Sequence, residues 1–302
     1  MSKNYRAKWH DYRARCIYHL TLMKSPESPY FGQLAGDCKI PIGQLGSPYV
    51  IASPLGAAIK QTLRSLRTIH PALRLYQYAL MPDHLHLLLS VESELDEILG
   101  RKIAIFKQQV HSATGLTSVF ESGFNDQILK PDRNLNVIFD YIRANPYRLA
   151  VRLQNPEFFR RNVALVINGI PCKAYGNTQL LSNPFIEQVV VHRADNDSTF
   201  NSSKERWFHT AANGGILVSP FISKREKEIR DGAEELGGRF ILITERPYSD
   251  REKPTGRDFE LCTQGRMLII SPAQPLTFSR AACLQMNSLA QAISSANTIQ
   301  FI

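Results

Sequence analysis

Residues 81–91 read MPDHLHLLLSV, and the alternation within this stretch predicts a β-strand with two different faces. Successive side chains of a strand point to opposite sides, so Leu85, Leu87 and Leu89 are expected on one face and His84 and His86 on the other. The leucines predict contact with a core. The two imidazoles can together ligate one metal ion, although the pair alone names no particular metal and also fits a merely polar surface.

The segments around this strand predict an α+β domain. A basic-faced helix is expected from Pro54, with Ser53 as its N-cap, after a Pro- and Gly-rich loop over 24–53 that has room for a hairpin. A second helical pattern covers 94–115 and stops near Gly115. The β-like runs are 15–23, 73–81, 84–91 and a short one within 119–128. This order predicts a ferredoxin-like split β-α-β fold with an antiparallel sheet.

A further helix is expected over residues 131–151, with an apolar stripe formed by Leu135, Ile138 and Ile142. Tyr141 and Asn145 lie four residues apart, so they share an adjacent, more polar face. Pro146 lacks an N–H donor and disfavours helical geometry at Asn145, so the helix is expected to end or kink there. The amide of Asn145 would then project from a helix end.

Together, the two segments resemble the single-tyrosine HUH transposases, particularly the relatives associated with REP elements. In that family a strand with the pattern Met-Pro-Asn/Asp-His-x-His precedes a helix with the pattern Tyr-Ile-x-x-Asn-Pro. Here the first pattern runs from Met81 to Leu89, and the second comprises Tyr141, Ile142, Asn145 and Pro146. The match covers residues 5–155, including an opening strand, IYHLTL, like that of the family.

The resemblance implies a catalytic site and a reaction. His84, His86 and Asn145 would hold a Mg²⁺ or Mn²⁺ ion, and Tyr141 would be the nucleophile that forms a 5′-phosphotyrosine link. The protein would be a single-strand DNA endonuclease and strand transferase acting in DNA transposition and recombination, with DNA single strands or hairpins as partner. The chain departs from the family in one place, since Gln127 in FNDQILK stands where relatives usually carry a histidine.

The distribution of charge supports an anionic partner. The net charge is +9, and residues 1–74 contribute +8 of it, from 11 basic and 3 acidic residues. Such a field attracts phosphate backbones without specifying a sequence. We expect DNA contacts from Lys8, Arg13, Arg15 and Arg148; Lys3, Arg6, Tyr5, Trp9 and Tyr12 add charge and stacking surfaces near the first three. The alternative is a solvated basic face with aromatic side chains packed beneath it.

The length of 302 residues predicts two domains. We expect an HUH domain at 1–155, a connector at 156–187 and an accessory α/β domain at 188–302. Strand-like runs at 187–193, 215–221, 239–245 and 266–272 alternate with helical patterns at 223–238 and 277–297, which predicts a parallel, Rossmann-like sheet. Residues 195–203 are polar and expected to form a loop.

Composition excludes several classes of protein. The five cysteines are odd in number and contain no CxxC pair, which argues against a disulfide framework or a zinc knuckle and favours the cytoplasm. No stretch has the length of apolar sequence that a membrane span or an export signal requires. Whether the protein is a monomer or a homodimer is left open. A second function is also left open, namely a non-catalytic nucleic-acid-binding module derived from a transposase.

Overall fold

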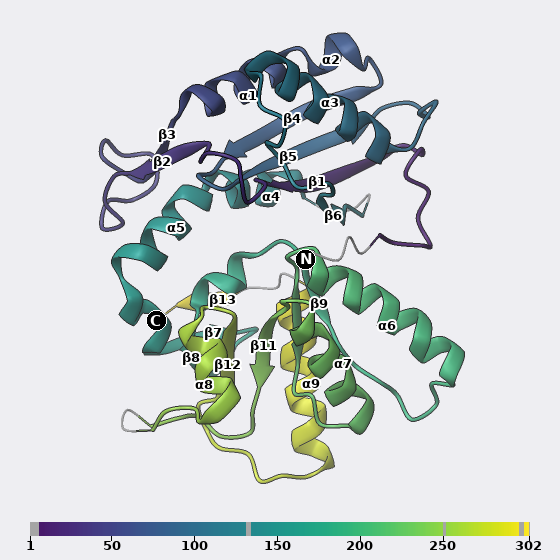
Figure 1. Cartoon of the computed structure of the whole chain (residues 1–302). Coiled ribbons are helices and arrows are strands. Elements are labelled where there is room, and N and C mark those ends of the chain that lie inside the picture. The colour runs from purple at the N-terminus through teal and green to yellow at the C-terminus, as the bar shows by residue number, and fades with distance from the viewer. Residues whose placement is uncertain (1–5, 131–133, 250–251, 296–298, 302) are drawn as a thin grey trace. The chain divides into compact units, whose positions relative to one another are not determined.

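A computed structural model describes residues 6–130, 134–249, 252–295 and 299–301 (Figure 1). The chain divides into two compact units, the first ending at Gln154 and the second beginning at Asn155. Each unit has its own sheet and its own core. In the part of the chain that is described, no helix combines the length and the hydropathy needed to cross a membrane.

The first unit is built on a four-stranded antiparallel sheet in the order β4-β5-β1-β6. The strands are β1 (Cys16–Met23), β4 (Leu73–Leu80), β5 (His84–Val91) and β6 (Asn125–Ile128). The helices are α1 (Pro54–Arg64), α2 (Leu66–Ile69), α3 (Leu99–Thr114), α4 (Leu135–Arg143) and α5 (Asn145–Gln154). β1 and β4 run parallel with β5 between them, and β5 and β6 run parallel with β1 between them. This is the expected split β-α-β arrangement.

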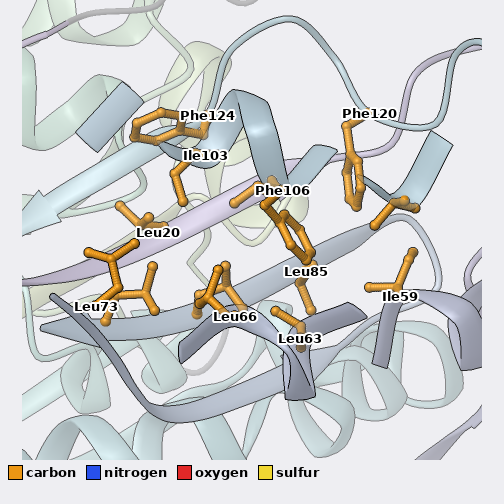
Figure 2. Close-up of a cluster of buried hydrophobic side chains, with 14 of the residues drawn as sticks. Leu20, Ile59, Leu63, Leu66, Leu73, Leu85, Ile103, Phe106, Phe120 and Phe124 are labelled. Carbon is orange, nitrogen blue, oxygen red and sulfur yellow. The ribbon is translucent and has the colours of Figure 1, made fainter. Parts of the chain in front are cut away.

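One face of this sheet makes the core of the unit. Leu85, Leu87 and Leu89 are at most 1% exposed, as their alternation in the sequence predicts. Helices α1 and α3 cover them, with Ile59 and Phe106 among the contacting side chains (Figure 2). Each large aliphatic side chain buried in this way stabilises the fold by about 1.5–3 kcal/mol.

Two of the expected helix ends are confirmed. Ser53 caps α1, its hydroxyl accepting a hydrogen bond from the N–H of Gly56 at 3.1 Å. Gly115 ends α3 in the left-handed conformation that glycine favours, with a φ of 70°. The start of the second expected helix is corrected, because α3 begins at Leu99 rather than near residue 94.

The Pro- and Gly-rich stretch between β1 and α1 contains a small hairpin, formed by β2 (Gly32–Ala35) and β3 (Tyr49–Ala52). Its base is fixed to the turn before the histidine strand, since Phe31 N–H donates to the Pro82 carbonyl at 2.7 Å. Its connecting loop is fixed to the end of α5. The Gln154 side chain accepts from Cys38 N–H at 2.9 Å and donates to the Gly36 carbonyl at 3.0 Å.

The second unit contains a seven-stranded mixed sheet in the order β13-β7-β8-β12-β11-β10-β9. The strands are β7 (Asn162–Ile167), β8 (Ile170–Gly176), β9 (Ile186–Gln188), β10 (Ile216–Ser219), β11 (Arg239–Ile243), β12 (Met267–Pro272) and β13 (Ile299–Phe301). The helices are η1 (Pro156–Arg160), η2 (Thr178–Ser182), α6 (Asp197–Ala212), α7 (Lys224–Glu235), α8 (Gly256–Thr263) and α9 (Arg280–Ser294).

Three expectations about this unit are corrected. The sheet is not wholly parallel: β9 to β12 are parallel as expected, but β8, β7 and β13 add antiparallel strands. Residues 156–187 are no connector, because they supply β7, β8 and the start of β9. Residues 195–203 are no loop, because the Asn196 side chain accepts from Thr199 N–H at 2.9 Å and so begins α6.

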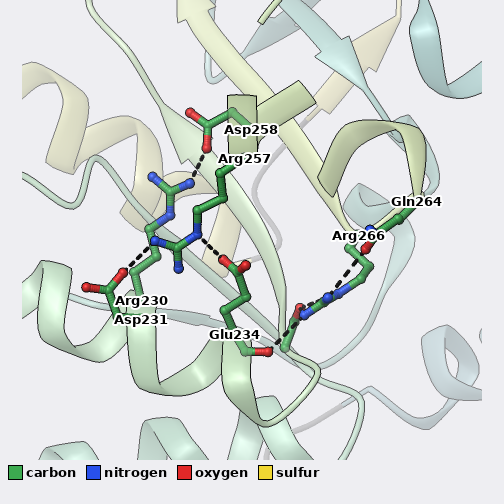
Figure 3. A network of polar contacts seen from close by, with 8 residues as sticks. Arg230, Asp231, Glu234, Arg257, Asp258, Gln264 and Arg266 are labelled. Carbon is green, nitrogen blue, oxygen red and sulfur yellow. Dashed lines mark hydrogen bonds and ion pairs between the residues drawn. The ribbon is translucent and has the colours of Figure 1, made fainter. Parts of the chain in front are cut away.

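Polar contacts fix the helices of the second unit. Arg257 on α8 forms ion pairs with Asp231 and Glu234 of α7, while Arg230 of α7 pairs with Asp258 of α8 (Figure 3). At the start of α7, Glu226 and Ser223 form a reciprocal capping box. The Glu226 carboxylate is 4% exposed. It accepts from Ile222 N–H at 3.0 Å and Ser223 N–H at 2.9 Å.

Candidate active site

The face of the first sheet opposite its core carries the two histidines. In the antiparallel register His84 lies opposite Met23 and His86 opposite Thr21, so both imidazoles share a face with the odd-numbered residues of β1. His86 is 8% exposed, while His84, at the strand's beginning, is partly exposed. The alternation predicted from the sequence therefore holds.

The two imidazoles face each other through the same ring atom. The Nε2 atoms of His84 and His86 are 3.1 Å apart. Two nitrogens on neighbouring positions of one octahedral ion, each at about 2.1 Å, lie about 3.0 Å apart. The separation thus fits two ligands of a single metal ion.

The opposite ring atom of each histidine has a partner. His84 Nδ1 lies 2.7 Å from the Asp83 carboxylate, and His86 Nδ1 lies 3.0 Å from the Thr21 hydroxyl. The hydrogen bond from His84 holds the pKa of Asp83 below its usual value. Partners of this kind fix the tautomer of a metal-binding histidine and leave Nε2 available as ligand. The two histidines therefore fit a divalent transition-metal ion that takes imidazole ligands.

A third histidine completes this cluster and was missed by the sequence analysis. His19 of β1 is 5% exposed, and its Nε2 lies 3.1 Å from His86 Nδ1. Burial, together with the charge of His84, lowers the pKa of His19 to about 3, so its ring is neutral at physiological pH. It approaches the side of His86 that points away from His84. His19 therefore supports His86 rather than joining the pair of facing nitrogens.

Helix α4 brings Tyr141 to the same cluster. Ile138 and Ile142 are fully buried, and Gln77 of β4 donates a hydrogen bond to the Phe139 carbonyl at 3.1 Å, which fixes the helix against the sheet. The Tyr141 ring then lies edge-on to His19, with centroids 6.0 Å apart. The structure brings the expected nucleophile and the histidines together through His19.

Asn145 lies at the break between α4 and α5. Its amide nitrogen is 3.3 Å from the Tyr141 carbonyl and 3.1 Å from the Ile142 carbonyl, so the side chain caps the end of α4. Within the described ranges, no group of three or more His, Cys, Asp or Glu side chains is arranged to bind a metal. Asn145 as a third, oxygen ligand stays a prediction.

Three of the residues expected to contact DNA lie in the N-terminal segment. Lys8 and Arg15 are exposed, as is Trp9, which is 54% exposed. Arg13 is exposed as well, but its guanidinium donates to the Leu95 carbonyl and to Glu94, both at 3.0 Å, so it also holds the N-terminal segment in place.

Two residues of the basic N-terminal segment have structural contacts. Arg6 forms an ion pair with the fully buried Asp126 and lies 3.7 Å above the Phe124 ring. Tyr12 donates a hydrogen bond to the same carboxylate at 2.7 Å. The other residues named from the sequence, Lys3 and Tyr5, lie outside the described residues.

Two more residues named from the sequence lie at the cluster. Gln127 is opposite His19 in the pairing of β6 with β1, so it shares the histidine face, and it is 5% exposed. The guanidinium carbon of Arg148 on α5 lies 4.1 Å from the centroid of the Tyr141 ring. This contact places a positive charge beside the phenol.

Comparisons with known proteins find similarity among solved structures. The chain matches no protein-family model and no curated protein. Among solved structures it is similar to a REP-associated tyrosine transposase bound to a REP hairpin, with 15% identity and a TM-score of 0.34. The alignment covers 48% of this chain and 74% of the other. The case for a function therefore depends on the side chains described above.

Proposed function

We propose that the first unit is a metal-dependent transposase domain of the HUH single-tyrosine type, which cleaves and rejoins single-stranded DNA. One observation carries the proposal. The Nε2 atoms of His84 and His86 face each other at 3.1 Å while both Nδ1 atoms have partners, and the buried Tyr141 ring lies against the same cluster.

In this reaction the Tyr141 oxygen attacks a backbone phosphorus. A bond forms between the phenolic oxygen and phosphorus, and the bond from phosphorus to the 3′ oxygen breaks. The phenol loses one proton and the departing 3′ oxygen gains one, so the products are a 5′-phosphotyrosine and a free 3′-OH. A 3′-OH can later attack the phosphotyrosine and rejoin the strand without another energy source.

Each residue of the site would have a separate role in this reaction. His84 and His86, with Asn145 as the proposed oxygen ligand, would hold Mg²⁺ or Mn²⁺, which when bound supplies charge stabilisation at the phosphate and the 3′ oxygen. Arg148 lies beside the phenol, where its guanidinium can contact a phosphate oxygen. The contact with His19 and the packing of α4 hold the Tyr141 ring in one orientation.

The test is an assay for a covalent adduct between protein and DNA. Labelled single strands and hairpins from the DNA that flanks the gene are incubated with the full chain and Mn²⁺ or Mg²⁺, then separated under denaturing conditions. We expect a metal-dependent adduct that is lost in Tyr141→Phe and retained in Tyr147→Phe, a matched change on the next helix. DNA binding without an adduct in any condition would instead favour the non-catalytic binding module.

A further inference from the structure

Helix α5 carries two arginines one turn apart. Arg148 and Arg152 are separated by four residues, so their side chains leave the same face of the helix at a spacing of about 5–6 Å. The position of Arg148 above the Tyr141 ring shows which way this face is turned. Arg152 is therefore directed along the same side of the unit as the nucleophile.

Arg152 differs from other basic residues of the first unit in its contacts. Its side chain is exposed, and it forms no ion pair or hydrogen bond with the residues that the structure describes. Arg143 pairs with Asp140, and Lys24 donates to the carbonyls of Ser25, Pro26 and Ser28, so those cations are engaged within the unit. Arg152 keeps its full hydrogen-bonding capacity for an external anion.

The backbone that carries Arg152 is fixed as well. The end of α5 is held by the contacts of Gln154 with Gly36 and Cys38. The Arg152 side chain thus projects from a fixed backbone.

On the basis of the proposed function, we propose that Arg148 and Arg152 form a phosphate track for single-stranded DNA, with Arg148 at the scissile phosphate and Arg152 at the adjacent one. Arginine suits this task because its planar guanidinium matches two phosphate oxygens. One helical turn is also comparable to the step between neighbouring phosphates of an extended strand. The track would fix which phosphate comes to lie against Tyr141.

The first measurement is the affinity for a fluorescein-labelled oligothymidine of about 16 nucleotides, across a range of salt concentrations. It uses Tyr141→Phe protein, which retains the ring beneath Arg148 but lacks the nucleophile, so binding is measured even if no cleavage exists. We expect Arg152→Gln to raise Kd about five- to tenfold at low salt and to reduce the salt slope by about 0.7.

The matched control is Arg101→Gln, on α3, the helix that covers the core face of the sheet. It removes one exposed charge from the same unit, so we expect less than a twofold change in Kd. Arg152→Lys keeps the charge and should recover the salt slope. If Arg152→Gln binds no worse than Arg101→Gln, the track is refuted.

The second measurement locates the contact. Strands that form the Tyr141 adduct are synthesised with a single neutral methylphosphonate at each phosphate near the cleavage site. With wild-type Arg152, the substitution at one phosphate adjacent to the scissile one should weaken binding. With Arg152→Gln the same substitution should have no further effect.

The outcomes separate this inference from the proposed function. An adduct without any coupling between Arg152 and an adjacent phosphate overturns the track alone. Failure to find an adduct, with a selective loss of affinity and salt slope in Arg152→Gln, overturns the reaction but keeps the binding residue.

Discussion

Replacing Asp83 by asparagine should weaken metal binding at the site without unfolding it. The carboxylate lies 2.7 Å from His84 Nδ1, and asparagine retains a carbonyl at that position but loses the charge. Changing a residue that hydrogen-bonds a metal-binding histidine usually costs 10–100-fold in metal affinity. The Asp83 side chain is 51% exposed, so water screens the interaction. We therefore expect the lower end of this range, an affinity for the metal that is about tenfold weaker, which corresponds to about 1.4 kcal/mol of binding free energy.

Isothermal titration of Mn²⁺ into the full chain near neutral pH measures this effect directly. Asp96→Asn is the matched control, because it removes an exposed carboxylate that pairs with Lys102 at 2.6 Å rather than with a histidine. We expect the control to bind Mn²⁺ as the wild type does. A Kd for Asp83→Asn within twofold of the control would refute the claim that Asp83 orients His84 for a metal.

Two further predictions concern the stability of the first unit. Burial lowers the pKa of Lys107 to about 8 from 10.5, so between these values the unfolded chain binds more protons than the folded one. The free energy of unfolding, measured by urea titration, should therefore rise with pH across this window by up to about 3 kcal/mol. Lys107→Met should flatten this rise. The same dependence on pH in Lys107→Met as in the wild type would contradict the prediction. A Cβ on Gly56 would lie 1.9 Å from the Phe31 carbonyl, whereas one on Gly100 meets nothing nearer than 3.9 Å. Gly56→Ala should lower the stability by about 1–3 kcal/mol and Gly100→Ala should raise it by about 0.4–1 kcal/mol, and equal shifts of the two urea midpoints would refute the packing argument.

The sequence predicts the site to the extent that its geometry is local. The alternation through His84 and His86 places both imidazoles on one face of a strand. The buried leucines that alternate with them place the core on the opposite face, so the prediction does not depend on the rest of the fold. The break beside Asn145 is similarly local, because Pro146 imposes it. Both features are seen in the structure.

Features that depend on register or on distant partners were not predictable. His19 reaches His86 through the pairing of β1 with β5, and nothing in IYHLTL distinguishes it from a surface histidine. Arg6 pairs with Asp126, which lies 120 residues further along the chain. Without knowledge of that partner, Arg6 looks in the sequence like an arginine that binds DNA. Knowing the offset between the two strands would have identified His19 as a residue facing the histidine pair.

The antiparallel strands of the second unit were missed for a different reason. Residues 162–176 form β7 and β8 across a tight turn at Asn168 and Gly169, both with positive φ. Asn-Gly between two apolar runs is a strong hairpin signal, and it stood in the sequence. The signal was available, and assigning this stretch to a connector overlooked it.

The capping of α7 has a consequence for what the second unit can recognise. In parallel α/β domains, the turn from a strand into the next helix offers its N–H groups to the phosphates of nucleotides. In the turn from β10 to α7 those groups already bind the chain's own buried anion, Glu226, which also accepts from Val191 N–H at 3.3 Å. A phosphate entering this turn would meet a like charge and would have to displace the carboxylate from the Ile222 and Ser223 N–H groups, so the turn discriminates against phosphorylated ligands.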